Sequence, residues 1–156
     1  IWSMLDRATS AHIERQLQQL ARLETDYDEL LRASTGEEPE LVGRTALSAV
    51  VQSFYQGVEG IFQTIAKRVD GSMPSSADWH RRLLQQMAAG TDGRPEVISL
   101  DVLERLEPFL GFRPLARHTY PFLLDWARMR DLVREIAPLH TLLRRDLEKF
   151  IKTMGE

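Results

Sequence analysis

The chain has 156 residues, of which 43% are hydrophobic and 28% are charged, so it holds enough apolar material for one globular domain over residues 1–156. It has no cysteine, which excludes a disulfide scaffold, a thiolate zinc site and a cysteine nucleophile, and which fits a reducing cytoplasm, where we expect the protein. No apolar run approaches the ~18 residues of a membrane span, and no signal peptide is recognisable.

The charge is unevenly distributed, although the net charge is only −3. Residues 1–48 carry 5 basic and 9 acidic side chains, whereas residues 111–152 carry 9 basic and 5 acidic ones. A local basic surface on a mildly acidic protein is what a phosphate-binding site requires. The alternative is a solvated helix face whose charges pair with one another.

The first half of the chain predicts two long helices. Apolar residues recur at steps of three and four from Ile13 to Leu30, so the first helix should cover about residues 3–32. A breaker-rich segment at 34–39 ends it. The same spacing then continues from Leu47 to Val69, which predicts a second long helix that packs antiparallel to the first.

Three further helices are expected in the second half. Ser75 or Ser76 can cap a helix that ends before Gly90, and Ser99 can cap the next one. Pro108 and Pro114 should kink or break that helix. The last helix should start near Asp125, with a kink at Pro138. The prediction is therefore an all-α bundle of about five helices.

One segment, Arg113-Pro-Leu-Ala-Arg117-His118-Thr-Tyr120, combines residues suited to cutting RNA without a metal. A guanidinium grips phosphate through two parallel hydrogen bonds, and an imidazole exchanges protons near neutral pH. His12 and His140 have no partner at metal-ligand spacing, so we predict no metal site and no cofactor.

The spacing raises a geometric problem, since five residues on a straight helix correspond to about 140° of rotation. Arg113 and His118 would then face different directions, while Arg117 and Tyr120 would share the face of Arg113. Two arrangements bring the pair together. A helical segment can start at Pro114, which frees Arg113, or a two-fold dimer can present Arg113 of one chain to His118 of the other.

The Arg-x4-His-x-Tyr motif resembles the signature of HEPN-domain ribonucleases, in particular the HepT toxins. Further blocks look like those of HepT-like proteins, in the same order between about Ala46 and Leu147. They are Phe54–Ala66 with Glu59, Asp78–Met87 with His80, and Phe112–Tyr120 followed by Leu124-Asp125-Trp126.

This resemblance implies a helical bundle that forms a symmetric homodimer and cleaves RNA without a metal. His118 would act as general base or acid and Arg113 would bind the scissile phosphate, with Arg117 adding affinity for RNA or a partner. It also implies a partner, a nucleotidyltransferase antitoxin of the MntA kind, which transfers AMP to Tyr120.

Glu59 and His80 lie in the resembling blocks and are candidates for a supporting role; packing between helices, or a buried polar pair, explains them more simply. The chain departs from the resemblance at Pro114, where relatives usually carry a polar residue. Two alternatives therefore stay open. One is a non-catalytic HEPN module that binds a nucleotidyltransferase or RNA without cleaving it, and the other is an unrelated helical bundle.

Overall fold

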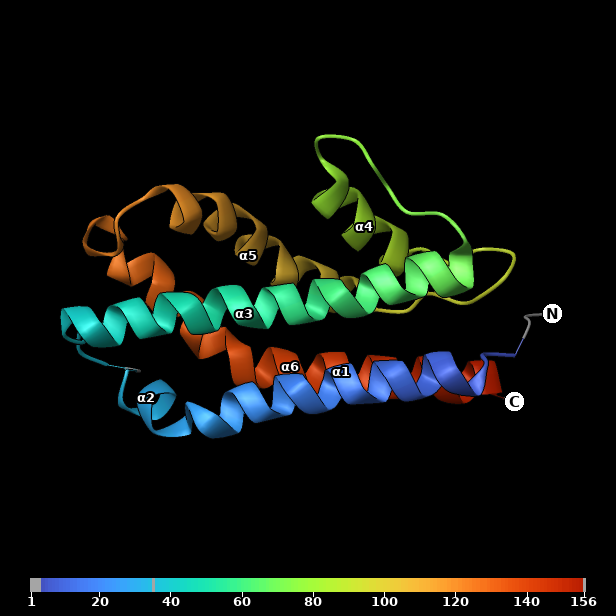
Figure 1. The fold of residues 1–156 in the computed structure, drawn as a ribbon, viewed down its shortest axis with the longest axis horizontal. Coiled ribbons are helices and arrows are strands. Elements are labelled where there is room, and N and C mark those ends of the chain that lie inside the picture. The colour runs from blue at the N-terminus through green and yellow to red at the C-terminus, as the bar shows by residue number, and fades with distance from the viewer. Residues whose placement is uncertain (1–3, 35, 156) are drawn as a thin grey trace.

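A computed structural model describes residues 4–34 and 36–155, except for the side chains at positions 113–115, 117 and 121. Within that part the protein is all-α, as predicted, with six α-helices and two short turns of other helical types (Figure 1). The elements are α1 (Arg7–Asp26), α2 (Asp28–Ala33), α3 (Leu41–Ile65), η1 (Ala66–Asp70), α4 (Trp79–Ala88), α5 (Leu100–His118), η2 (Pro121–Leu123) and α6 (Trp126–Gly155).

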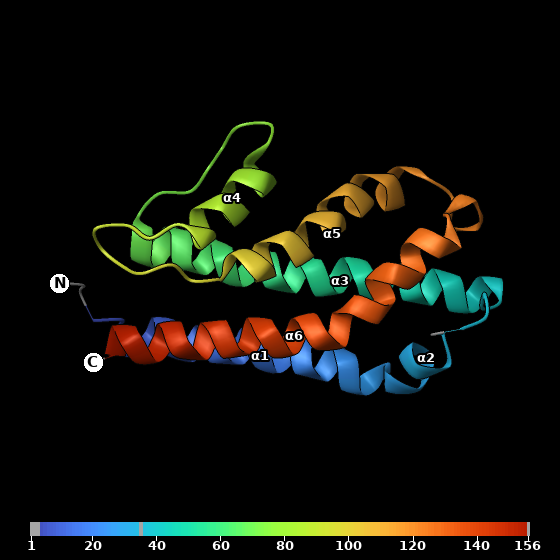
Figure 2. The same ribbon diagram turned by 180° about the vertical axis from the view of Figure 1, so that it is seen from behind.

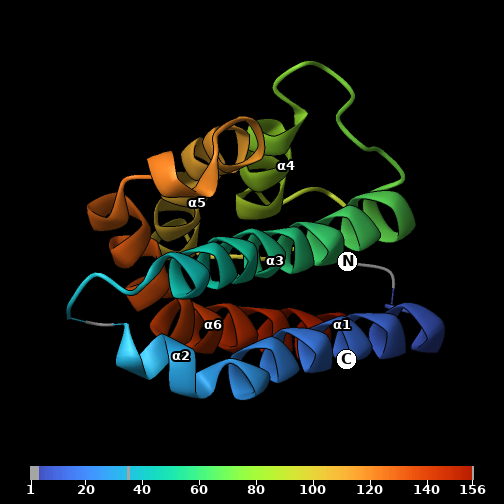
Figure 3. The same cartoon turned by 60° about the vertical axis from the view of Figure 1, so that its left-hand side comes forward.

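The long helix α3 lies at the centre of the molecule. Helices α1 and α6 lie on one side of it, and α4 and α5 lie on the other (Figures 1 and 3). As predicted, the first two long helices, α1 and α3, run antiparallel; α6 is a third long helix that also packs on both of them. The first and last described segments meet at one end of the bundle, where the Leu5 amide donates to the Met154 carbonyl oxygen at 3.2 Å. No helix in the described residues is both long and apolar enough to cross a membrane.

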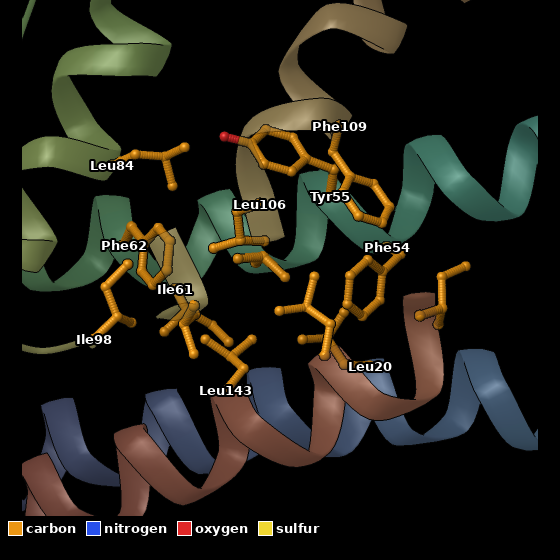
Figure 4. Close-up of a cluster of buried hydrophobic side chains, with 14 of the residues drawn as sticks. Leu20, Phe54, Tyr55, Ile61, Phe62, Leu84, Ile98, Leu106, Phe109 and Leu143 are labelled. Atoms are coloured by element: carbon orange, nitrogen blue, oxygen red, sulfur yellow. The ribbon is translucent and has the colours of Figure 1, made fainter. Parts of the chain in front are cut away.

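The core forms around α3, because this helix is enclosed on both sides and therefore carries apolar residues on most of its surface. Tyr55 points to the α5 side, whereas Phe54 points toward Leu20, and the ring of Phe109 from α5 contacts both (Figure 4). The ring centroids of Phe54 and Tyr55 lie 5.5 and 6.3 Å from that of Phe109. These contacts fix α5 on α3, and they hold the segment that leads to the Arg-x4-His-x-Tyr motif.

The first helix is shorter than predicted, because the chain breaks at Tyr27 into α1 and α2. The Thr25 hydroxyl bonds to the Ala21 carbonyl oxygen, and such side-chain bonds compete with regular helix. Asp28 and Glu29 then occupy the first turn of α2, where the helix dipole favours negative charge. The predicted single helix over residues 3–32 is therefore wrong.

The start of α4 also differs from the prediction, which placed the cap at Ser75 or Ser76. The Ser76 hydroxyl donates to Asp78 Oδ1 at 2.6 Å, and the Ser76 carbonyl oxygen accepts from the Trp79 amide, so this serine forms a turn and the helix begins at Trp79. The cap predicted at Ser99 is confirmed, since its hydroxyl accepts from the Val102 amide at 3.3 Å.

Neither proline breaks α5, which is helical from Leu100 through Pro108 and Pro114 to His118. Of the expected kink or break at the motif, the break is therefore wrong. Each proline removes one backbone hydrogen bond, and packing on α3 and α6 holds the helix. The last helix starts at Trp126 as predicted, contains Pro138, and changes direction along its length (Figure 2).

Candidate functional site

The motif lies at the C-terminal end of α5 and in the connection to α6. The helix ends at His118, and Thr119 is extended, with φ −125° and ψ 142°. His118 is the last residue of α5, and its side chain is exposed. The side chains of Arg113 and Arg117 lie outside the described part of the structure, so only their positions on the helix are known.

Positions 113 and 118 lie on one unbroken helix, which separates them by about 140° around the axis. Two arrangements could bring Arg113 and His118 together: a new helical segment that starts at Pro114, or a two-fold dimer. Since α5 runs through Pro114, the first arrangement is absent. Tyr120 also differs from the expectation that it shares a helical face with Arg113, because it lies beyond the end of α5.

The connection after α5 exposes an aromatic pair. Tyr120 is 69% and Phe122 57% exposed, and their rings stack with centroids 5.3 Å apart and planes 9° apart. Leu123 beside them is 65% exposed, whereas Leu124 and Trp126 are buried. The buried pair anchors the connection to the core, and the exposed side chains form an apolar surface next to His118.

Glu59 and His80 form a partly buried polar pair between α3 and α4. The Nδ1 atom of His80 lies 2.7 Å from Oε2 of Glu59, whose side chain is 6% exposed. The Trp79 ring stacks on the imidazole at a centroid distance of 3.6 Å. A buried carboxylate that holds one ring nitrogen fixes both the orientation and the tautomer of a histidine. The expectation of a polar pair between helices is confirmed, although only Glu59 is buried and His80 is 28% exposed, and the pair is compatible with a supporting role.

The most extensively bonded side chain of the described structure belongs to Arg94, which the sequence did not single out. It is 0% exposed and forms a bidentate ion pair with Asp70, at 2.6 and 2.9 Å. The pair joins the end of η1 to the loop between α4 and α5. Its partners are 24 residues apart, and an arginine in a Gly-Arg-Pro loop resembles any exposed turn, so no local signal revealed it.

A second residue that sequence reasoning missed is Arg128, in the first turn of α6. Its Nη2 atom lies 2.8 Å from where a Cβ atom on Gly111 would be, so the guanidinium rests on the bare surface of α5. The only signal in the sequence was Gly111 within a helical stretch. A glycine there costs stability and often marks a place where another group packs closely against the backbone.

Among the described residues, no group of three His, Asp or Glu side chains has the arrangement of a metal site. His140 pairs instead with Glu24, through Nδ1 and Oε1, and is buried between α6 and α1. His12 is half-buried on α1.

Comparison with known proteins yields one family. The model of the family described as "HepT-like protein" matches residues 46–154, which include α4, α5, almost all of α6 and most of α3. No curated protein and no solved structure matches the chain. The match covers more than half of the sequence and includes the whole Arg-x4-His-x-Tyr motif, and the chain therefore belongs to the HepT-like protein family.

Proposed function

We propose that this protein is the RNA-cleaving toxin of a HepT/MntA-type toxin–antitoxin pair, and that it cuts RNA without a metal ion. The observation that carries the proposal is the motif of a HepT-like protein with its histidine exposed at a helix end, where a phosphodiester can reach it. We further propose that the whole chain acts as one HEPN-type domain in the cytoplasm.

The proposed reaction uses the RNA's own 2′-hydroxyl as nucleophile. His118 accepts its proton, the 2′-oxygen bonds to phosphorus, and the bond from phosphorus to the 5′-oxygen breaks. The leaving 5′-oxygen takes a proton from the His118 imidazolium formed in this way, so that the histidine is neutral again and the products are a 2′,3′-cyclic phosphate and a 5′-hydroxyl. Proton transfer of this kind contributes about 10²–10⁴ in rate, and Arg113 stabilises the charge that develops on the phosphate.

We propose that two chains build each site. Because α5 is unbroken, positions 113 and 118 of one chain diverge by about 140°, whereas a two-fold partner can supply the missing arginine. The exposed apolar side chains of Phe122 and Leu123 are where we place part of the contact between chains, since large exposed apolar side chains next to one another mark interaction surfaces. Tyr120 stays outside this contact in the proposal.

Control by a nucleotidyltransferase of the MntA kind is the third part of the proposal. Tyr120 is 69% exposed and lies two residues after His118, so its hydroxyl is open to a modifying enzyme. An AMP group on that oxygen would place a phosphate and a nucleoside beside His118. With Arg117 pairing to this phosphate, the modification would block RNA by both bulk and charge.

We assign Glu59 and His80 a supporting role in the same scheme. Their bond joins α3 to α4 at the side of α3 on which α5 also packs. A rigid arrangement of these three helices keeps the end of α5 in place. A change of Glu59 is therefore expected to reduce activity together with stability.

Two measurements test the proposal. Purified protein should cut RNA in the presence of EDTA, and His118→Ala should abolish cleavage while leaving the fold and the thermal unfolding temperature unchanged. Incubation with ATP and the nucleotidyltransferase should add AMP to the wild type and not to Tyr120→Phe, as mass spectrometry reads it.

The non-catalytic alternative rests on Pro114, which lies inside α5 and offers neither a side-chain hydrogen bond nor an N–H. If the wild type accepts AMP on Tyr120 and binds RNA yet never cuts it, the protein is a module that presents a substrate to its partner. A change of Pro114 to Asn should then restore cleavage.

A further inference from the structure

The side chain of Arg128 has the features of a ligand-binding cation. It is exposed, and among the described residues it forms no hydrogen bond and no ion pair. Asp125 and Asp131 lie three residues before and after it on the same segment, and neither pairs with it; Asp125 Oδ1 instead accepts from the Ala127 amide at 3.0 Å. The positive charge of Arg128 is therefore available.

Gly111 determines where this charge lies. A Cβ atom at position 111 would be 2.8 Å from Arg128 Nη2, closer than Cβ atoms approach other atoms in folded proteins, so the guanidinium takes this position only because residue 111 is glycine and would have to shift if a larger residue stood there. The two helices are held in this register by a bond between Arg105 Nη1 and Glu135 Oε1 of 2.7 Å, two turns away along the same contact. Arg128 thus reaches from α6 across to the surface of α5.

That surface leads to His118. Gly111 and His118 are seven residues apart on one helix, so they share a face to within about 20° and are separated by about 10.5 Å along the axis. At a rise of about 3.4 Å per nucleotide in a helical strand, this distance corresponds to about three nucleotides, and to fewer in an extended strand. An RNA strand that follows this face from His118 therefore meets a second positive charge.

We propose that Arg128 binds a phosphate of the RNA strand one to three nucleotides from the bond that is cut, and that Gly111 provides the space for it. The inference rests on the proposed function, since it names how the same site holds its substrate. A guanidinium binds phosphate through two parallel N–H donors, which gives both affinity and a fixed direction to the strand. Arg128 touches a phosphate that does not react, so it contributes to binding and not to the chemical step.

The test measures binding of a short single-stranded RNA whose 2′-oxygens are methylated, so that no cleavage occurs. Arg128→Gln should weaken binding several-fold and lower the slope of log Kd against log salt concentration by about 0.7, the change for one lost phosphate contact on a single strand. With a cleavable RNA, KM should rise while kcat stays the same. Arg144→Gln is the matched control, because Arg144 lies on the same helix and is paired with Glu148 at 3.0 Å.

Gly111→Ala supplies an independent variant, since its new methyl group displaces the guanidinium. It should weaken binding less than Arg128→Gln does, because the flexible side chain shifts and keeps its charge. The double variant should be no weaker than Arg128→Gln alone, because both changes act on one contact. Gly155→Ala is its control, as nothing lies within 4 Å of that position.

Unchanged Kd and salt slope in Arg128→Gln, with a wild type that cuts RNA, would overturn the role of Arg128 and leave the proposed function standing. A wild type that neither binds nor cuts RNA would overturn both.

Discussion

Replacing Arg94 with methionine should be among the most destabilising single changes in this protein. All five N–H donors of the guanidinium are used: Nε and one Nη2 hydrogen on Asp70, the other Nη2 hydrogen on the Gln86 carbonyl oxygen at 3.0 Å, and the two Nη1 hydrogens on the carbonyl oxygens of Ala89 and Pro95, at 2.8 and 2.9 Å. The side chain is 0% and that of Asp70 7% exposed. Methionine fills a similar volume but satisfies none of these acceptors.

The magnitude follows from what the change leaves behind. Removing one partner of a buried ion pair costs about 3–5 kcal/mol, because the other charge stays in the protein without compensation. In a domain of this size each kcal/mol lowers the midpoint of thermal unfolding by about 2–4 °C, so a decrease of roughly 6–20 °C is expected. Asp70 keeps one bond, from Gln86 Nε2 at 2.7 Å, which places the expected value toward the lower end.

Urea unfolding followed by circular dichroism measures the loss directly. Arg144→Met is the control, since that arginine is 58% exposed in an i,i+4 pair and its loss should cost less than 0.5 kcal/mol. The double variant Arg94→Met with Asp70→Asn should lose less unfolding free energy than the two single variants lose together, because no uncompensated charge remains in it. A loss below 1 kcal/mol in Arg94→Met would refute the reasoning.

Three further predictions concern helix contacts, pH and metals. Gly57→Ala should cost about 1–3 kcal/mol, because its Cβ would lie 2.5 Å from Cδ2 of the buried Leu20, whereas Gly60→Ala on the same helix should be neutral or stabilising in urea unfolding. Hydrogen bonds from the amide and hydroxyl of Thr9 lower the pKa of Asp6 below its ordinary 3.8. The ionised Asp6 carboxylate therefore contributes fully to stability above pH 3.8, and this contribution is lost as the pH falls through the lower pKa of the folded state. Asp6→Asn should remove that part of the pH dependence between pH 5 and 2, and an unchanged profile would contradict the assignment. RNA cleavage should persist in EDTA; loss that Mg²⁺ restores would exclude the metal-free mechanism.

The all-α class and most helices were predictable because their signal is local. Apolar residues at three- and four-residue steps indicate each long helix, and a serine with free amides after it predicted the start of α5 at Ser99. The errors arose where two local rules competed. At Ser76 the hydroxyl bonds to Asp78 in place of a helix amide, and at Pro114 packing on neighbouring helices outweighs the missing hydrogen bond.

The site was predictable only in part, since its parts are distant in sequence. His118 and Tyr120 stand out in the motif, and both side chains are exposed. The bond between Glu59 and His80 joins residues 21 apart, and the contact of Arg128 with Gly111 joins two helices. No periodicity reports such contacts, because they depend on how the helices pack.

The central claim is that two chains share each RNA-cleaving site, and mixing two inactive variants tests it most directly. Arg113→Ala and His118→Ala should each abolish cleavage. After random exchange of subunits, half of the dimers combine the two variants. If sites are shared, each of these mixed dimers contains one complete site out of two, so about a quarter of the wild-type rate should return. A mixture that exchanges subunits, as light scattering and tagged copies can verify, and yet stays inactive would contradict the shared site.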